Sequence, residues 1–499
     1  MIGTTRFFRR FLSLIGPRIL STLVAVVSTP IIVRLLGPGG YGDYAVLLSI
    51  YSLYMIPISS AITEGVQKFV AEEREIDGWV ERVLQFYLGL ALLLAIVGSA
   101  VLVGLTWFGF AGVFGEGFTL YLYVLAGFIL VGQSRAYIMH TLLGFGLESI
   151  NGPLDLTKKV ATVLVGIALV LSGLGITGML LGHIFANGLV ALVGGYFVFR
   201  RISIPRLFEL PKSVPYREFL SFNGLNIVLV LLVMSLFHVD VVMVRTLVGD
   251  EATGFYKAAL ALAEYLWIVP IVLQTMLLHS SSSLWSEGRT DQITELAGRI
   301  TRYTTLLVLL MAIGLAVLAD RVVPLYYGRE FAVATTPLLL LLPGAVGFAV
   351  ARPLQAICQG SGQLKTLILA VGVAATGNIT LNTVLIPRYG MNGAAVATSV
   401  SYGSMFVLLV WASWRIGYDP LVDLRPARIA VTATGAGMTI LAIDGLLDND
   451  LVALVVVPIV GLAVYSAGTL LTGALDRDEV LEILAQLPLP YDFDIGSEG

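Results

Sequence analysis

Long apolar stretches separated by short polar ones run through almost the whole chain. A helix needs about 20 apolar residues to cross a bilayer, and stretches of that length recur from residue 11 to residue 473. We therefore predict an all-α, polytopic membrane protein with about fourteen transmembrane helices. The predicted spans are 11–33, 42–66, 83–106, 118–143, 157–174, 177–199, 219–247, 254–279, 302–324, 333–358, 364–386, 392–414, 427–446 and 451–473.

The pattern also contains an internal repeat. Arg34–Ala45 reads RLLGPGGYGDYA and Arg245–Ala258 reads RTLVGDEATGFYKA, so each copy passes from an arginine through a Gly-rich turn into a Gly-aromatic helix start. Further glycines recur in the same order about 215 residues later, as a duplication produces. Two homologous halves of this kind are common among membrane transporters, and we expect six helices in each.

The longest polar stretch, residues 200–218, lies between the two repeats and is the expected linker. Because six is an even number, both halves enter the membrane from the same side and should form parallel repeats. The predicted organisation is a six-helix lobe (1–199), a cytoplasmic linker (200–218), a second six-helix lobe (219–417), two appended transmembrane helices (418–475) and a cytoplasmic tail (476–499).

The composition excludes several classes of protein. The chain has 57% hydrophobic and 13% charged residues, whereas soluble proteins have about 45–50% and about 25%. The net charge of −3 gives no electrostatic footprint for nucleic acid. The single cysteine, Cys358, excludes an internal disulfide and a cysteine-based metal cluster. No predicted soluble region is large enough to house catalysis, so we do not expect an enzyme and expect neither a metal nor a cofactor.

The basic residues predict the orientation. Most of the 30 Lys and Arg residues lie in the N-terminal segment and in alternate loops, with a cluster between Arg200 and Arg217. Cytoplasmic loops of membrane proteins carry the excess of Lys and Arg. We therefore expect a multi-pass protein of the plasma membrane with both termini in the cytoplasm.

Cysteine labelling tests this orientation. A Gly112→Cys variant should react with a membrane-impermeant maleimide in intact cells, whereas Lys212→Cys should react only after the inner face is exposed, because the two positions lie in loops on opposite sides. Labelling of Lys212→Cys from outside intact cells would refute the topology.

Several segments at helix junctions resemble a known group of transporters. They are LLGPGGYGDYAVLLSIYSL (Leu35–Leu53), VDVVMVRTLVGDEATGFYKAALALAEYL (Val239–Leu266), ICQGSGQLK (Ile357–Lys365) and LNTVLIPRYGMNGAAVATSVSY (Leu381–Tyr402). The chain resembles the MOP flippase superfamily over about residues 7 to 415, specifically its polysaccharide-biosynthesis branch of Wzx-like oligosaccharide-lipid flippases. Lipid II flippases and MATE drug exporters are more distant members.

The resemblance implies two lobes that form a V around a central cavity open alternately to each side. Its implied cargo is a lipid-linked sugar phosphate, moved from the cytoplasmic to the outer leaflet by a monomer among membrane lipids, with glycan-assembly enzymes as candidate partners. The alternative is an ion-coupled MATE-like exporter of amphipathic small molecules. The nucleotide-binding pattern GxxxxGK[ST] is absent, so coupling to protons, sodium or the membrane potential stays open.

Three arginines within predicted spans are candidates for binding the phosphate. Arg18, Arg135 and Arg352 all lie roughly 12–14 Å from the expected cytoplasmic helix ends at 1.5 Å per residue, and Arg135 and Arg352 have nearly equivalent places in the repeat. Charges at this depth generally face a bundle interior or a wet cavity, and a guanidinium can bind phosphate with two parallel hydrogen bonds. We expect Arg135 and Arg352 to face each other across the lobes. In the other interpretation each arginine ties its own lobe together or extends toward the interface.

Other polar residues within the predicted spans have both a functional and a structural interpretation. Asp240 and Glu264 are candidates for ion coupling, although Asp240 could form an ion pair with Arg245. Glu264 has no obvious cation on its own helix face, since Lys257 lies two turns back. Asn223 and Asn226 could bind sugar hydroxyls, but hydrogen bonds between helices are the favoured role. Two further expectations, a Glu64–Lys68 pair at the interface and packing roles for His140 and His183, complete the set.

Overall fold

The computed structural model describes residues 4–115, 117–202, 215–221, 224–479 and 481, with the backbone alone for residues 4–19, 216, 220, 221 and 279. Within these ranges the chain is almost entirely helical and contains no strand, which confirms the all-α prediction. The first half of the chain contains α1 (Thr4–Ala71), α2 (Trp79–Trp107), η1 (Phe110–Val113), α3 (Phe118–Gly144), α4 (Glu148–Leu169), η2 (Val170–Leu174) and α5 (Gly175–Phe199).

The second half begins with a short helix and continues with long ones. Its elements are α7 (Tyr216–Ser221), α8 (Gly224–Leu247), α9 (Asp250–Glu264), η3 (Tyr265–Trp267), α10 (Ile268–Ser286), α11 (Thr290–Val317), α12 (Ala319–Tyr327), η4 (Arg329–Ala334), α13 (Thr335–Gly360) and α14 (Leu364–Ile416). Two further helices, α15 (Pro426–Asp444) and α16 (Asp450–Thr472), follow it.

Eleven helical runs within the described residues are long and apolar enough to cross a membrane. Three of them, Leu20–Ala71, Glu148–Phe199 and Leu364–Ile416, contain 52 or 53 residues, more than twice the roughly 20 residues that one crossing needs. Each is interrupted by glycine in a backbone conformation that other residues rarely adopt: Gly37 at φ 67°, Gly173 at φ 95° and Gly390 at φ 57°. This division is compatible with fourteen spans, and that number stays a prediction.

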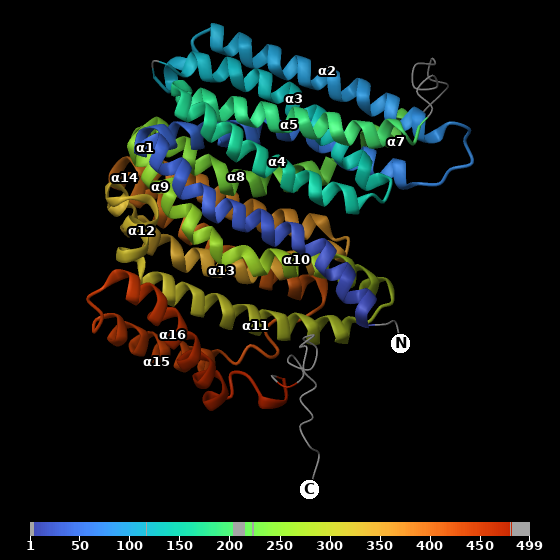
Figure 1. Cartoon of the computed structure of the whole chain (residues 1–499). Helices are drawn as coiled ribbons and strands as arrows, with labels where there is room; N and C mark the ends of the chain where they lie inside the picture. Colours follow the sequence, from blue (N-terminus) through green and yellow to red (C-terminus); the bar gives the residue numbers. More distant parts are fainter. Residues whose placement is uncertain (1–3, 116, 203–214, 222–223, 480, 482–499) are drawn as a thin grey trace.

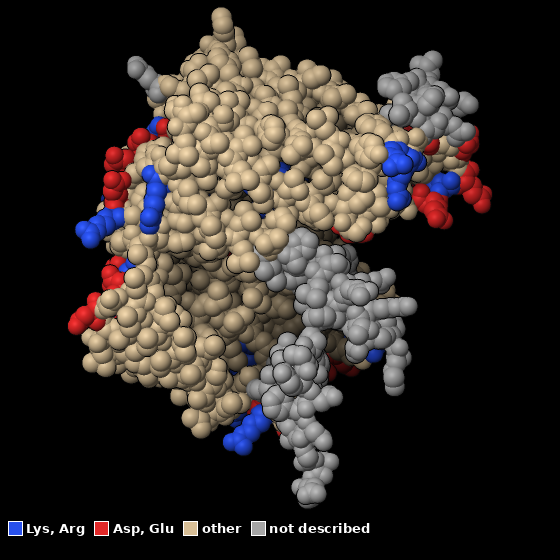
Figure 2. Space-filling view, viewed as in Figure 1, with Lys and Arg blue, Asp and Glu red and all other residues tan. Residues whose placement is uncertain are grey.

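The helices run side by side in one bundle (Figure 1). In this view α2, α3 and α5 lie at the top, α11, α15 and α16 lie at the bottom, and α1, α8 and α9 lie between them. We call the end that holds the N-terminus the N-terminal end, and the opposite end the far end. Figure 2 shows charged residues at both ends, with an almost uncharged surface between them that suits lipid contact, and this surface is hollowed between the upper and lower parts.

The two copies of the repeated motif contact each other at the far end. A Cβ on Gly42 would lie 2.1 Å from the backbone oxygen of Asp250, and a Cβ on Gly254 would lie 2.0 Å from that of Pro38. Only glycine allows this close approach. Beside it, Arg245 Nε lies 2.6 Å from Asp43 Oδ1. The repeat found in the sequence therefore forms part of the contact between the halves.

Helix α7 attaches the start of the second half to the first half at the N-terminal end. The Phe219 side chain is buried, and its ring centroid lies 4.5 Å from that of Phe69 and 5.7 Å from that of Trp79. Next to this aromatic cluster, Arg74 forms a 2.6 Å ion pair with Glu218. Most of the predicted linker, residues 203–214, lies outside the described residues.

Arginines at both ends hold the last two helices against α11 and α12. At the N-terminal end, buried Arg302 pairs with Asp423 at 2.9 Å and with Glu479. A hydrogen bond from Arg425 lowers the pKa of Asp476 there. At the far end, Arg321 pairs with Asp444 at 3.0 Å and with Asp450 at 2.8 Å. The hairpin of α15 and α16 is thus fastened at both ends.

Candidate functional site

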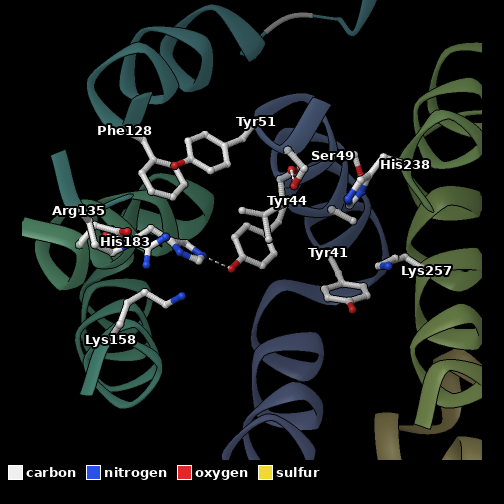
Figure 3. Close-up of a pocket in the computed structure, with 14 residues that line it drawn as sticks. Tyr41, Tyr44, Ser49, Tyr51, Phe128, Arg135, Lys158, His183, His238 and Lys257 are labelled. Carbon is white, nitrogen blue, oxygen red and sulfur yellow. Dashed lines mark hydrogen bonds between the residues drawn. The ribbon is translucent and has the colours of Figure 1, made fainter. Parts of the chain in front are cut away.

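A cavity of about 360 Å³ lies between the two halves of the chain (Figure 3). Helices α1, α3, α4 and α5 line one side of it, and α8 and α9 line the other. Its walls combine cationic, hydroxyl-bearing and aromatic side chains. They are Tyr41, Tyr44, Ala45, Leu48, Ser49, Tyr51, Ser52, Phe128, Arg135, Lys158, His183, Asn187, His238 and Lys257.

Three cations line this cavity, and none of its described lining residues is acidic. Arg135 on α3 and Lys158 on α4 come from the first half, whereas Lys257 on α9 comes from the second half and lies across the cavity from them (Figure 3). The Nε atom of Arg135 is buried without a hydrogen-bond partner in the described structure. Such a group favours an acceptor that a ligand can supply.

Carboxylates outside the cavity balance the two lysines. Lys158 Nζ lies 3.1 Å from Asp155 Oδ1, one helical turn away, and Lys257 Nζ lies 3.8 Å from Glu264 Oε1. Within the described residues Arg135 has no ion pair of this kind, so the cavity keeps a net positive charge. A charge in a region of low dielectric attracts its opposite more strongly than it does in water.

Aromatic residues stiffen the wall beside Arg135. The rings of Tyr51 and Phe128 are stacked with centroids 3.9 Å apart and 2° between their planes. The Tyr44 hydroxyl lies 2.7 Å from His183 Nε2. His183 thus packs between helices, as expected, but also faces the cavity, while His140 contacts Gln67 at 3.1 Å.

The structure places Arg352 elsewhere and corrects the expectation that it faces Arg135 in one site. Arg352 does not line this cavity. It donates a 3.1 Å hydrogen bond to Gln274 and lies 4.8 Å from the ring of Trp267 and 4.9 Å from that of Phe348, all within the second half. Equivalent places in a repeat set the depth of a residue in the membrane but not the direction in which its side chain points. Cation–π contacts hold Arg352 inside its own half.

The other candidate substrate residues do not line the cavity or lie outside the description. The backbone of Arg18 is in α1, but its side chain is outside the described residues, as is all of Asn223. Asn226 donates a hydrogen bond to Glu64 and so joins α8 to α1, the role that was favoured for it. The expected Glu64–Lys68 ion pair is not present, because Lys68 lies 3.7 Å from Glu72 instead.

Asp240 lies at the centre of a fully buried polar network in the second half. Its carboxylate accepts hydrogen bonds from the Tyr256 hydroxyl, from Thr398 Oγ1 at 3.0 Å and from the Val241 amide at 2.7 Å. The alternative ion pair with Arg245 is absent, because residues five apart on a helix point in different directions. Arg245 pairs with Asp43 instead.

Two asparagines of α14 continue this network. Asn378 Nδ2 lies 3.4 Å from Thr398 Oγ1, and Asn382 Nδ2 donates a 3.0 Å hydrogen bond to Asn378 Oδ1. The Oδ1 atom of Asn382 is buried without a partner in the described structure. These residues are about 140 positions from Asp240 in the chain, so no local sequence pattern joins them to it.

The expectation that Lys257 is too distant to neutralise Glu264 is wrong. Their side chains approach to 3.8 Å, because seven residues make nearly two full turns and both point to the same helix face. Sequence reasoning also missed Lys158 and Lys257 as cavity residues. The predicted spans 157–174 and 254–279 put both lysines within the first turn of a span, where they were counted with the charges that flank the membrane. In the structure α4 begins at Glu148 and α9 at Asp250, which places both lysines well inside helices.

Comparisons with known proteins agree with this architecture. A family model described as polysaccharide biosynthesis protein matches residues 31–336. An uncharacterised membrane protein of Methanocaldococcus jannaschii is 21% identical over 258 residues, and the match spans half the length of each chain. The probable low-salt glycan biosynthesis flippase Agl15 of Haloferax volcanii is 21% identical over 473 residues, which cover 91% of this chain and 94% of that protein.

Two solved structures show the fold. The lipid II flippase MurJ in an inward closed conformation has a TM-score of 0.71 at 14% identity, covering 92% of this chain and 98% of that chain. An inward-facing MATE-family multidrug resistance transporter of the MOP superfamily has a TM-score of 0.66 at 14% identity, covering 79% of this chain and 94% of that chain. This chain therefore has the helical transporter fold that these two proteins share.

Proposed function

Because this chain belongs to the polysaccharide biosynthesis protein family, we propose that it is a flippase for a phosphate-linked lipid glycan, which it moves from the cytoplasmic to the outer leaflet by alternating access. Relatives named as flippases, such as Agl15, support this choice. The process moves a lipid and needs no chemical step. In this proposal the protein lies in the plasma membrane, and the N-terminal end of the bundle faces the cytoplasm. Both termini are on the cytoplasmic side.

The observation that carries the proposal is the cationic cavity between the halves. Arg135 can offer its unpartnered Nε and its terminal nitrogens to phosphate oxygens. Lys158 adds positive charge from the same half, and Lys257 adds it from the opposite half. A phosphate-linked sugar head group that fills the cavity contacts both halves at once, and the tyrosine and serine hydroxyls offer hydrogen bonds to its sugar.

Binding across the halves gives the substrate a way to shift the conformational equilibrium. Cations from opposite halves repel each other when they approach in a region of low dielectric, and an anion between them removes that repulsion. The phosphate also competes with Glu264 for Lys257. At the far end, the contact between Asp43 and Arg245 holds the halves together, and release into the outer leaflet requires it to break.

The Asp240 network is the proposed coupling site. A buried carboxylate without an ion pair is costly, so it either takes up a proton or binds a cation. The oxygens of Asp240, Thr398 and Asn382 come from two helices of the second half, and oxygen ligands of this kind suit a hard cation such as sodium. Glu264 is a second candidate that acts through its pairing with Lys257.

The alternative is an exporter of amphipathic cations, and the shared fold with a MATE transporter favours it. The charge of the cavity argues against that choice, because a cationic drug would meet Arg135, Lys158 and Lys257 where it has to bind. An anionic head group would be attracted by the same residues.

Reconstitution of the full chain in proteoliposomes tests the function. We expect a fluorescent glycan diphosphate attached to a long-chain lipid to become accessible to an impermeant quencher in the opposite leaflet at least tenfold faster than in protein-free vesicles. A lipid cation of similar size is the control and should not be moved. Accumulation of organic cations without movement of the glycolipid would support the exporter instead.

A further inference from the structure

The cavity described above is the proposed site of the head group, but a phosphate-linked lipid also has a hydrocarbon chain that polar walls do not accommodate. A second hollow of about 480 Å³ lies between α1, η1 and α8. Its lining is apolar and aromatic. One described hydroxyl belongs to that lining, on Tyr54, and it donates a 2.9 Å hydrogen bond to the backbone oxygen of Gly98. This groove therefore presents hydrocarbon alone to whatever occupies it.

The groove extends along most of α8 and along a shorter stretch of α1. Its residues on α8 extend from Ile227 to Met243, which is about 24 Å at 1.5 Å per residue. On α1 they lie between Ile50 and Pro57, about 10 Å at the same rise. One leaflet of the hydrocarbon core is only about 15 Å deep, half of roughly 30 Å. The α8 side of the groove is thus longer than one leaflet is deep.

The groove and the cationic cavity lie on two sides of one helix contact. Along α1, Ser49 lines the cavity and the next residue, Ile50, lines the groove. Along α8, His238 lines the cavity and Val239 the groove. Ser49 Oγ lies 3.2 Å from His238 Nδ1, so this polar contact closes the seam between the two spaces. Opening this seam joins an anion site directly to an apolar channel.

We propose that the groove between α1 and α8 holds the hydrocarbon chain of the transported lipid, and that the chain reaches the head group through the seam closed by Ser49 and His238. The inference rests on the proposed function, because it needs a lipid whose phosphate occupies the cavity. The hydrocarbon chain of the lipid then stays in the same groove while the head group crosses the membrane, because the groove is longer than one leaflet is deep.

A pair of tryptophan substitutions tests the groove. Leu231 lines it and is 46% exposed, whereas Val228, one turn earlier on α8, is 43% exposed and does not line it. Leu231→Trp fills the groove and should slow glycolipid translocation at least tenfold. Val228→Trp adds the same ring at a lipid-facing position and should change the rate less than twofold. Equal rates for both variants would overturn the proposal.

Binding of inorganic pyrophosphate to the purified full-length protein distinguishes a failure of the groove proposal from a failure of the proposed flippase function. Pyrophosphate has no chain, so its affinity for Leu231→Trp should stay within twofold of that of the unchanged protein. A protein that neither binds pyrophosphate nor moves glycolipid refutes the proposed function. A protein that does both, and whose Leu231→Trp variant still translocates normally, refutes the groove alone.

Photocrosslinking identifies the occupant. A long-chain lipid diphosphate with a diazirine in the middle of its chain should label residues 50–57 and 227–243. Excess unlabelled lipid diphosphate should reduce that labelling at least fivefold, and phosphatidylglycerol should not. Equal competition by both lipids would show that bulk phospholipid fills the groove, and labelling confined to residues 426–472 would place the chain at the last two helices. Either result contradicts the proposal.

Discussion

Arg135→Ala should reduce glycolipid translocation by roughly 30-fold or more while the protein still accumulates in the membrane. Removing one partner of a buried charge pair costs about 2–5 kcal/mol, and each 1.4 kcal/mol corresponds to about tenfold in affinity. Arg135 is the cavity cation without an ion pair in the described structure, so a bound phosphate would lose its strongest partner. Translocation in proteoliposomes, normalised to the amount of folded protein, measures the effect.

Two lysines of α4 provide a matched control. Lys158 lines the cavity, and Lys159 does not, although both are near the same carboxylate of Asp155. Lys158→Ala should therefore slow translocation, and Lys159→Ala should leave it within twofold. Arg135→Lys should recover part of the activity, because an ammonium keeps the charge but not the two-pronged geometry. Near-normal transport by Arg135→Ala would leave the arginine with a purely structural role.

Asp240→Asn should make translocation insensitive to the driving ion and lower the gradient-driven rate by roughly tenfold or more. The carboxylate is 0% exposed, accepts three hydrogen bonds and has no ion pair in the described structure. An amide of the same shape neither takes up a proton nor balances a cation, and leaving a buried site unbalanced costs several kcal/mol, about 3–5 in measured cases. Translocation under imposed sodium, proton or potential gradients shows which dependence disappears.

Two further variants separate coupling from folding. Thr398→Val keeps the shape of the side chain but removes an oxygen that contacts Asp240, so it should weaken the ion dependence without abolishing transport. Asp320→Asn removes a carboxylate from the exposed start of α12 and should change nothing. An unchanged ion dependence in Asp240→Asn would exclude this network as the coupling site.

The arginines show how far sequence reasoning could reach. Spacing from the helix ends gave Arg135 and Arg352 the same depth, because the rise of a helix per residue is constant. Whether a side chain points into a cavity or into its own half depends on how the helix is rotated, and the packing of neighbouring helices sets that rotation. Arg135 therefore lines the cavity, while the rings of Trp267 and Phe348 surround Arg352.

The polar network around Asp240 also could not be predicted from the sequence as a whole, although one of its members could. Asp240 was recognisable as a charge in an apolar helix, since such residues stand out against their neighbours. Its partners Tyr256 and Thr398 did not stand out, because a hydroxyl is ordinary in a membrane helix and the distance along the chain hides the contact. A residue whose role depends on its contacts with distant residues cannot be recognised from its own position in the sequence.

Hydrophobicity was enough to predict a membrane protein built of helices, and the resemblance of the segments at helix junctions was enough to predict its family. These properties are local or periodic, because each span has to satisfy its own backbone hydrogen bonds in lipid. The cavity of Arg135, Lys158 and Lys257, the seam of Ser49 and His238, and the contact between Gly42 and Gly254 arose from packing. Each joins helices that are far apart in the chain. These contacts depend on side-chain shapes and helix rotations, which the periodicity of the sequence does not specify.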